Sequence, residues 1–265
     1  MESIVRREGV PHPPTPAVER NPIVHWETPR GSPRLGEDEV HVWRITLPSV
    51  DLERVSGILS EDERRRAARF RFPTHRRRFL ATRAGLKAIL ALYLDLDPTA
   101  VDLTVGPFGK PRLADDPGIE FNLAHSGDVA LVAVSRGRPV GVDVEKMRRG
   151  IPYERLAERF FAPSEAAALR SLPPTIRSAG FFACWTRKEA WLKASGHGLE
   201  RGLPSALPRF TVSVEPDPIA LTVTLPGRPD EGARWSLVDL RVGSGYAGAM
   251  AVQGPARTRF YRWAS

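Results

Sequence analysis

Hydrophobic and polar positions alternate over residues 39–47, which read EVHVWRITL. Alternation of this kind is typical of a β-strand with one buried face. Short apolar pieces between 101 and 145, broken by GPFGKP and AHSGD, predict further strands. Strand-like character returns between Arg209 and Gln253, in RFTVSV, IALTVTL, RWSLVDL and YAGAMAV.

Helical spacing replaces the alternation in three places. SEDERRRAARF has Ser60 as a predicted N-cap, with acids in the first turn. Residues 174–195 predict another helix, with Gly196 as its C-cap. Between them, residues 74–94 carry an apolar stripe at helical spacing, formed by Phe79, Leu80, Leu86, Ile89, Leu90 and Tyr93.

The order of these elements predicts an α+β fold, because a strand, helices and strands occur twice in succession. We expect an N-terminal α+β half over 37–137 and a C-terminal half over 138–255. A single mixed α+β domain is the alternative, since no repeat is visible in the letters. Residues 1–36 hold seven prolines and no periodicity. They predict an extended or disordered leader without an apolar face to dock.

Composition favours a globular protein, with 42% hydrophobic and 26% charged residues in a chain of 265. No apolar stretch approaches the roughly 18 residues of a membrane span, and the N-terminus has no signal-peptide core. Cys184 is the only cysteine, so no disulfide within the chain can form. These features predict a cytoplasmic protein that does not engage membranes.

The net charge is +8, carried by 34 arginines and only 5 lysines. A basic surface implies an acidic partner, which can be nucleic acid, an anionic cofactor or an acidic protein. Three of the five lysines, Lys110, Lys188 and Lys193, lie in the motifs described next. Selection for a compact ammonium there and chance placement are both open interpretations.

The segment VGVDVE places two acids on one strand face. Val140, Val142 and Val144 share one side of the predicted strand, so Asp143 and Glu145 share the other. Carboxylates roughly 7 Å apart repel each other unless a cation lies between them, and Mg²⁺ prefers such oxygen ligands. The alternative is an ordinary exposed strand face.

A second motif, CWTRKEAWLKASGHG, places Trp185, Glu189 and Lys193 four residues apart on one helix face. An exposed Glu–Lys pair is the alternative, although the aromatic ring one turn earlier indicates a covered face. Lys188 points about 100° away. Two turns add a cation and an imidazole, Lys110 in FGKPRL and His125 in FNLAHSGD.

In chain order, GKPRL, FNLAHSGD, GVDVE, RFFAPSEAAAL and WTRKEAWLKASGHGL resemble the motifs of the 4′-phosphopantetheinyl transferases of the surfactin-synthetase (Sfp-like) type. The resemblance runs from Val40 to Val252. It implies a pseudo-dimer of two α+β halves with the active site in the cleft between them. It also implies Mg²⁺-dependent transfer, with Mn²⁺ as an alternative ion. The phosphopantetheine arm of coenzyme A would move to a serine hydroxyl of an apo carrier protein, releasing adenosine 3′,5′-bisphosphate.

The same resemblance implies roles for single residues. Asp143, Glu145 and Glu189 would be metal ligands, and Glu189 would also be the base, directly or through a metal-bound water. Lys193 would act in catalysis by holding a pyrophosphate oxygen. Coenzyme A would be bound by Arg66, Arg78, Lys110, His125 and Lys193. Ala124 replaces a serine that the family usually has, whose hydroxyl is expected near the 3′-phosphate.

The implied partners are acidic acyl or peptidyl carrier proteins, which suit a basic monomer. Two rivals differ in class. A nucleic-acid-binding protein fits the basic charge, but the chain has no DNA- or RNA-reading motif and that function has no use for three converging acids. A non-catalytic carrier-binding homologue has no use for intact acids either. The sequence therefore favours the transferase over both.

Overall fold

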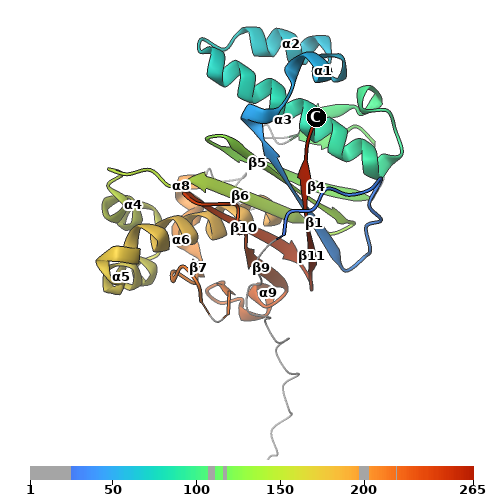
Figure 1. Ribbon diagram of the computed structural model, residues 1–265. Helices are drawn as coiled ribbons and strands as arrows, with labels where there is room; N and C mark the ends of the chain where they lie inside the picture. Colours follow the sequence, from blue (N-terminus) through green and yellow to red (C-terminus); the bar gives the residue numbers. More distant parts are fainter. Residues whose placement is uncertain (1–24, 107–110, 116–117, 197–202, 219) are drawn as a thin grey trace, which may run out of the picture.

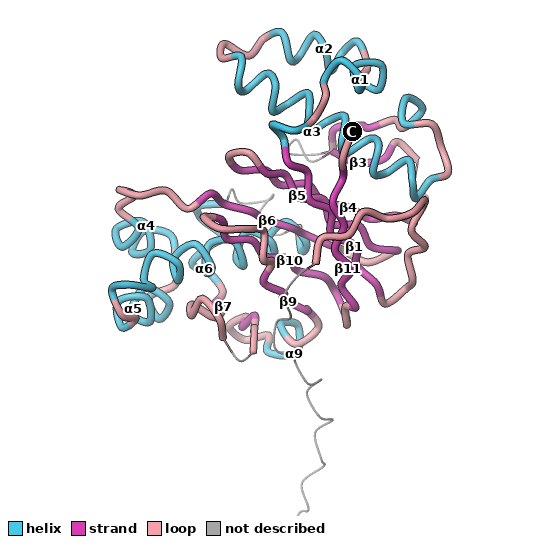
Figure 2. The backbone as a smooth tube through the Cα atoms, in the orientation of Figure 1, coloured by secondary structure: helices cyan, strands magenta, loops and turns pink. Residues whose placement is uncertain are grey.

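Two β-sheets lie face to face between two long helices in the computed structural model, which describes residues 25–106, 111–115, 118–196, 203–218 and 220–265 (Figures 1 and 2). The first sheet has the strand order β11-β1-β5-β4, and the second has the order β6-β10-β9. Helix α3 covers the outer face of the first sheet, and helix α6 covers that of the second. The predicted α+β pseudo-dimer is confirmed.

The longer strands are β1 (Glu39–Thr46), β4 (Ile119–Ser126), β5 (Val129–Arg136), β6 (Val140–Lys146), β9 (Trp235–Asp239), β10 (Tyr246–Gln253) and β11 (Arg257–Trp263). Shorter strands are β2 (Leu103–Val105), β3 (Pro111–Leu113), β7 (Thr211–Val212) and β8 (Val223–Thr224). The α-helices are α1 (Leu52–Val55), α2 (Glu61–Ala68), α3 (Pro73–Leu94), α4 (Tyr153–Phe160), α5 (Pro163–Ser171), α6 (Pro174–Ser195), α8 (Leu203–Ala206) and α9 (Pro229–Gly232). Short 3₁₀ turns are η1 (Leu47–Ser49), η2 (Ser56–Ile58), η3 (Pro98–Ala100) and η5 (Leu207–Arg209).

Strand alternation sorts the apolar side chains of β1 into two cores. Trp43 and Ile45 pack beneath α3. Val40 and Val42 point the other way, into a core between the two sheets. Both faces of β1 are therefore buried along the middle of the strand, although half of its residues are polar. The first sheet thus supports α3 on one side and the second half on the other.

Strand β6 is sorted in the same way, as the sequence predicts. Val140, Val142 and Val144 fill the core between the sheets, so the opposite face of β6 is turned toward α6. Gly141 lies on that opposite face. A Cβ there would overlap the carbonyl oxygen of Ala190 and lie 2.5 Å from the backbone nitrogen of Ala194, both on α6. Glycine therefore allows α6 to approach β6 closely.

Side chains, not a strand ladder, connect the two halves along β4 and β6. The side-chain oxygen of Asn122 accepts a hydrogen bond from the Val142 amide at 2.9 Å. Four residues on, the Ser126 hydroxyl accepts one from the Lys146 amide at 3.1 Å. The two bonds have the same spacing on both strands, so together they fix the register of one half against the other.

Helix boundaries follow their sequence signals. Ser60 and Glu63 form a reciprocal capping box at the start of α2. Gly196 ends α6 in a left-handed conformation with φ of 76°. The predicted strands RFTVSV and IALTVTL contain only the two-residue strands β7 and β8 in the described structure. Among the described residues, no helix is both long and apolar enough for a membrane crossing.

Two features differ from the sequence prediction. The C-terminal strand β11 lies beyond the predicted end of the second half at 255, yet it pairs in parallel with β1 of the first sheet. Residues 25–36, assigned to the leader, contact the fold at several points. The Glu27 amide donates to the Phe260 carbonyl at 3.0 Å, and Trp26 contacts the Phe260 ring. The expectation of a leader with nothing to dock is wrong for these residues, while residues 1–24 lie outside the described structure. The boundary near 138 remains a proposal.

Candidate functional site

Strand β6 and helix α6 bring an ammonium and two carboxylates together. Asp143 extends from the α6-facing side of β6, and Glu189 and Lys193 lie one turn apart on α6. The Lys193 Nζ is 2.6 Å from Asp143 Oδ1 and 3.4 Å from the Val142 carbonyl oxygen. The close approach at Gly141 makes this contact possible. The strand face that carries Asp143 and the helix face that carries Glu189 and Lys193, both predicted from the sequence, therefore face each other.

Burial and mutual repulsion shift the titration of these groups. Burial raises the pKa of Asp143 to about 6, with Lys193 opposing the rise and Glu145 adding to it. Burial also raises the pKa of Glu189 to about 7; Lys193 again opposes, while Asp143 and Glu145 add to the rise. Burial alone would lower the pKa of Lys193, but Asp143 and Glu189 outweigh it and raise that pKa. A carboxyl with a pKa near 7 suits a general base.

The segment AHSGD contacts the end of β6, beside this group of charged residues. The Ser126 hydroxyl donates to Glu145 Oε2 at 2.8 Å and so orients the third acid. Gly127, with φ of 57°, makes the tight turn between β4 and β5. A Cβ there would collide with the ends of Lys146 and Tyr246. Asp128 follows, and its amide donates to the Tyr246 hydroxyl at 3.1 Å.

Arg78 and His125 border the same space from the first half. Arg78 on α3 forms an ion pair with Asp128, with Nη2 and Oδ1 2.7 Å apart. The His125 side chain is open to solvent. Partial desolvation by the surrounding protein lowers the pKa of His125, and the positive charges of Lys193 and Arg78 lower it further. Lys193 and Arg78 therefore both lie near the imidazole, and Glu145 lies near it too and opposes their effect.

Arg66, another predicted coenzyme A ligand, does not lie in this group. Arg66 lies on α2, where its guanidinium stands over the Phe79 ring, 5.4 Å from the centroid. Lys110 lies outside the described residues. Sequence reasoning places Ser126 beside His125 at a polar turn but assigns no role to Asn122, Ser126, Asp128 or Tyr246. Three of these four occur in FNLAHSGD, so the motif itself contains the signal.

Asp143, Glu145 and Glu189 suit a hard divalent cation by their all-oxygen chemistry. Asp143 Oδ2 also fits, since it is buried and has no hydrogen-bond partner in the described structure. As the described side chains stand, however, no three acidic, histidine or cysteine residues are gathered closely enough to hold a metal. Lys193 neutralises Asp143 instead. The three acids are thus candidate ligands by their chemistry, and their metal role is a proposal.

Lys188 and Trp185 have structural contacts. Lys188 is fully buried and bonds both carboxylate oxygens of Glu165, at 2.8 and 2.7 Å. Trp185 packs against Phe160, Phe161 and Phe181. The half-buried ring therefore ties α6 to the C-terminal end of α4. Lys188 points away from Asp143 and Glu145, as its place on the helix predicts.

Ala124 departs from the sequence expectation. It is buried in the core between the sheets, on the face of β4 that also carries Asn122 and Ser126. A serine here would place its hydroxyl toward β6 and not beside His125. That such a hydroxyl would lie near the 3′-phosphate stays a prediction, and the buried position of Ala124 counts against it.

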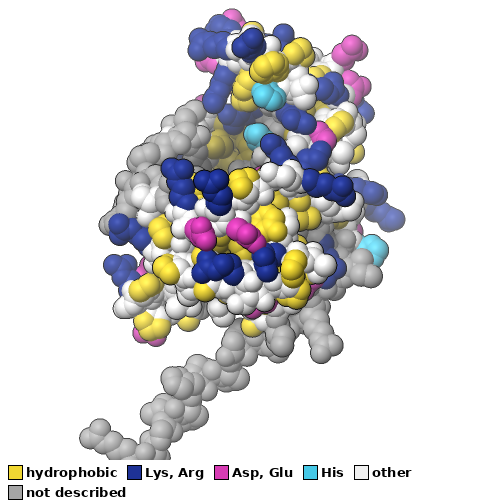
Figure 3. All heavy atoms as spheres, turned by 90° about the vertical axis from the view of Figure 1, so that its left-hand side faces the viewer, with side chains coloured by type: hydrophobic (Ala, Val, Ile, Leu, Met, Phe, Trp, Pro, Cys, Tyr) yellow, Lys and Arg dark blue, Asp and Glu magenta, His cyan; other side chains and the backbone are white. Residues whose placement is uncertain are grey.

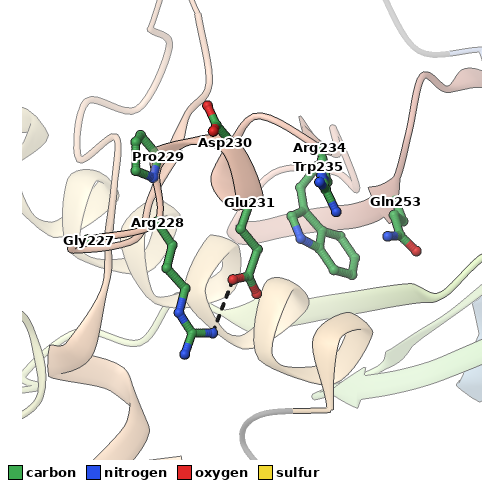
Figure 4. Close-up of a pocket in the computed structure, with 8 residues that line it drawn as sticks. All are labelled: Gly227, Arg228, Pro229, Asp230, Glu231, Arg234, Trp235 and Gln253. Carbon is green, nitrogen blue, oxygen red and sulfur yellow. Dashed lines mark hydrogen bonds and ion pairs between the residues drawn. The ribbon is translucent and has the colours of Figure 1, made fainter.

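A surface pocket with a volume of about 440 Å³ lies elsewhere. Arg228, Glu231, Arg234 and Trp235 contribute to its lining (Figure 4). Its Gln253 is six residues along β10 from the residue opposite Glu145, which is about 20 Å at strand spacing. The space-filling view instead shows a hollow below the α1–α3 helices, with Lys and Arg side chains around it (Figure 3).

Comparison with known proteins identifies the family. Residues 139–251 match the family model of the 4′-phosphopantetheinyl transferase superfamily, and residues 43–137 match that of the 4′-phosphopantetheinyl transferase N-terminal region. The 4′-phosphopantetheinyl transferase HetI of Nostoc sp. is 42% identical over 225 residues, which is 83% of this chain and 90% of that protein. The chain belongs to the 4′-phosphopantetheinyl transferase superfamily.

Further relatives carry the same description. A 4′-phosphopantetheinyl transferase of Bacillus subtilis is 31% identical over 171 residues, 64% of this chain and 73% of the relative. A putative 4′-phosphopantetheinyl transferase of Synechocystis sp. is 41% identical over 154 residues, 57% of this chain and 63% of the relative. The predicted resemblance to this enzyme class is confirmed.

Proposed function

We propose that this transferase moves the 4′-phosphopantetheine arm of coenzyme A to a serine hydroxyl of an apo acyl or peptidyl carrier protein. Adenosine 3′,5′-bisphosphate is the second product, and the reaction depends on Mg²⁺. The observation that carries the proposal is the convergence of Asp143, Glu189 and Lys193 where β6 meets α6. An isolated exposed strand or helix would not raise the pKa of two carboxyls in this way.

Each side chain has a task that fits its surroundings. Glu189, with a pKa of about 7 in the metal-free protein, accepts the proton of the attacking serine hydroxyl, directly or through a water molecule. Lys193 breaks its ion pair with Asp143 and instead holds a pyrophosphate oxygen as a point charge. His125 and Arg78 bind the 3′-phosphate end of coenzyme A, where their positive surroundings favour an anion. Ser126 keeps Glu145 in place beside them.

Mg²⁺ would be held by Asp143, Glu145 and Glu189, and when bound it neutralises charge that develops on the phosphate oxygens. The unpartnered Asp143 Oδ2 supports this assignment. The net charge of +8 supports an acidic carrier as protein substrate. We expect the enzyme to act as a monomer, since the ligand set comes from one chain.

Mass spectrometry of a panel of apo carriers incubated with coenzyme A tests the reaction. We expect a gain of one phosphopantetheine group on a carrier serine, equimolar adenosine 3′,5′-bisphosphate, and no gain after chelation of Mg²⁺. Asp143→Asn should abolish the gain. Asp217→Asn is the matched control, because Asp217 is exposed and pairs only loosely with Arg241, at 3.5 Å. No gain on any carrier would overturn the function, and transfer that survives chelation would overturn only the metal assignment.

A further inference from the structure

The link between α2 and α3 presents four consecutive exposed residues, Arg69, Phe70, Arg71 and Phe72, which we call the RFRF tip. Phe70 and Phe72 are 38% and 55% exposed, which is unusual for large apolar side chains. In Figure 2 this link projects from the top of the molecule, toward the side that Figure 3 turns to the viewer. Exposed aromatic and arginine side chains together are typical of protein interfaces.

Most arginines around the tip are already used inside the fold. One group bonds acids or carbonyl groups, namely Arg64, Arg65, Arg77, Arg78 and Arg83. In the described part of the chain, no acid or carbonyl bonds the side chains of the remainder, namely Arg66, Arg69, Arg71 and Arg76. Arg66 and Arg71 stand only over phenylalanine rings. The uncompensated positive charge of this region is therefore concentrated at the tip and the adjoining helix ends.

The tip also lies at the entrance to the candidate site. The Phe72 ring contacts His75 edge-on, with the centroids 5.6 Å apart. His75 is three residues before Arg78 and so shares its helix face, and Arg78 pairs with Asp128 beside the site. Phe72 and Arg78 are six positions apart along the chain, which is a rise of about 9 Å in a helix. The tip thus extends the wall of the site outward.

We propose that the RFRF tip is the docking surface for the acidic carrier protein whose serine accepts the phosphopantetheine arm. This inference rests on the proposed function. Charge complementarity selects an acidic surface, and the exposed rings call for apolar side chains beside the acids, which a small anion does not offer. Arg69 and Arg71 steer the encounter, and Phe70 and Phe72 supply the contact that holds it.

Steady-state kinetics with the full-length enzyme, an apo carrier and coenzyme A test the proposal. Arg71→Glu should lower kcat/KM for the carrier by about tenfold, and the loss should shrink as salt is raised. Phe72→Ala should lower it by about fivefold. The KM for coenzyme A and the thermal midpoint should stay unchanged, because these side chains are exposed. If the wild type transfers the arm and both variants have the same kcat/KM for the carrier, the docking assignment is overturned but the proposed function stands.

Two matched controls address general effects. Arg257→Glu makes the same charge change at the far end of β1, opposite Glu39. Leu96→Ala removes a 48% exposed apolar side chain just beyond the other end of α3. Neither should change kcat/KM for the carrier.

A rise in the KM for coenzyme A in the tip variants would instead assign the tip to the nucleotide. Loss of binding to a fluorescent single-stranded oligonucleotide, with kcat/KM for the carrier unchanged, would assign it to nucleic acid. Either result overturns the proposal.

Discussion

At the residue scale, Glu189 is the side chain on which proton transfer depends. It is 5% exposed, and the nearby acids add to the effect of burial on its pKa. Glu189→Gln keeps the volume but removes the base, so we expect kcat to fall by about 10²- to 10⁴-fold. Single-turnover transfer to a carrier measures this, with circular dichroism to verify folding. A variant within a few-fold of the wild type would show that Glu189 is not the base.

Lys188, the neighbour of Glu189, provides a contrasting residue. From its helix position alone, Lys188→Ala is expected to cost far less rate than Glu189→Gln. The fold adds a second consequence, because Lys188 and Glu165 are both buried and bonded to each other. Removing the ammonium leaves a buried carboxylate without its partner, so we expect the free energy of unfolding to fall by about 3–5 kcal/mol. Urea denaturation measures it, and an unchanged midpoint would show that water or protonation compensates.

His41 predicts a pH dependence of stability. Burial lowers the pKa of His41 below 6.5, with Glu39 opposing. As the pH falls below 6.5, the unfolded chain therefore takes up the proton before the folded one. The free energy of unfolding should decrease in that window, down to the folded pKa. His41→Gln removes this titration, so its thermal midpoint should fall less between pH 7 and pH 5. If the thermal midpoints of the two proteins fall equally between pH 7 and pH 5, His41 makes no contribution.

At the element scale, Gly141 sets the distance between β6 and α6. A methyl group there would overlap backbone atoms of α6, which are not free to move aside. Gly141→Ala should therefore separate Lys193 from Asp143, lower the thermal midpoint and reduce transfer. Gly57→Ala is the control, since no heavy atom lies within 4 Å of a Cβ built there. If the two variants behave alike, the close packing of β6 and α6 does not position the site.

Sequence patterns anticipated the elements better than their partners. Alternation predicted which face of β6 carries Asp143, and helical spacing placed Glu189 and Lys193 on one face, because both patterns are local. The bond from Ser126 to Glu145 joins residues 19 apart, and the pairing of β11 with β1 joins residues more than 200 apart. No local periodicity contains such contacts. In addition, the arginines at positions 257 and 259 on this exposed edge strand interrupt the apolar pattern by which β11 would be recognised.

At the scale of the whole molecule, residues 25–36 and β11 fasten the two halves together. Trp26 contacts Phe260 on the first sheet and donates through Nε1 to the Arg241 carbonyl of the second half at 3.1 Å. This segment therefore spans the junction on which the candidate site depends. The leader that composition alone assigns to 1–36 is part of the fold from residue 25 onward.

Truncation tests this contribution of the N-terminal segment. Deleting residues 1–36 removes the Trp26 contacts and the pairing of Glu27 with β11, so we expect a lower thermal midpoint and weaker transfer. Deleting residues 1–24 is the control, because all these contacts remain in the chain. In the full-length protein, Trp26→Ala should destabilise by about 1–3 kcal/mol, from lost apolar burial and one hydrogen bond. Equal midpoints for the two truncated proteins, with Trp26→Ala as stable as the wild type, would show that the segment rests on the fold without holding the halves together.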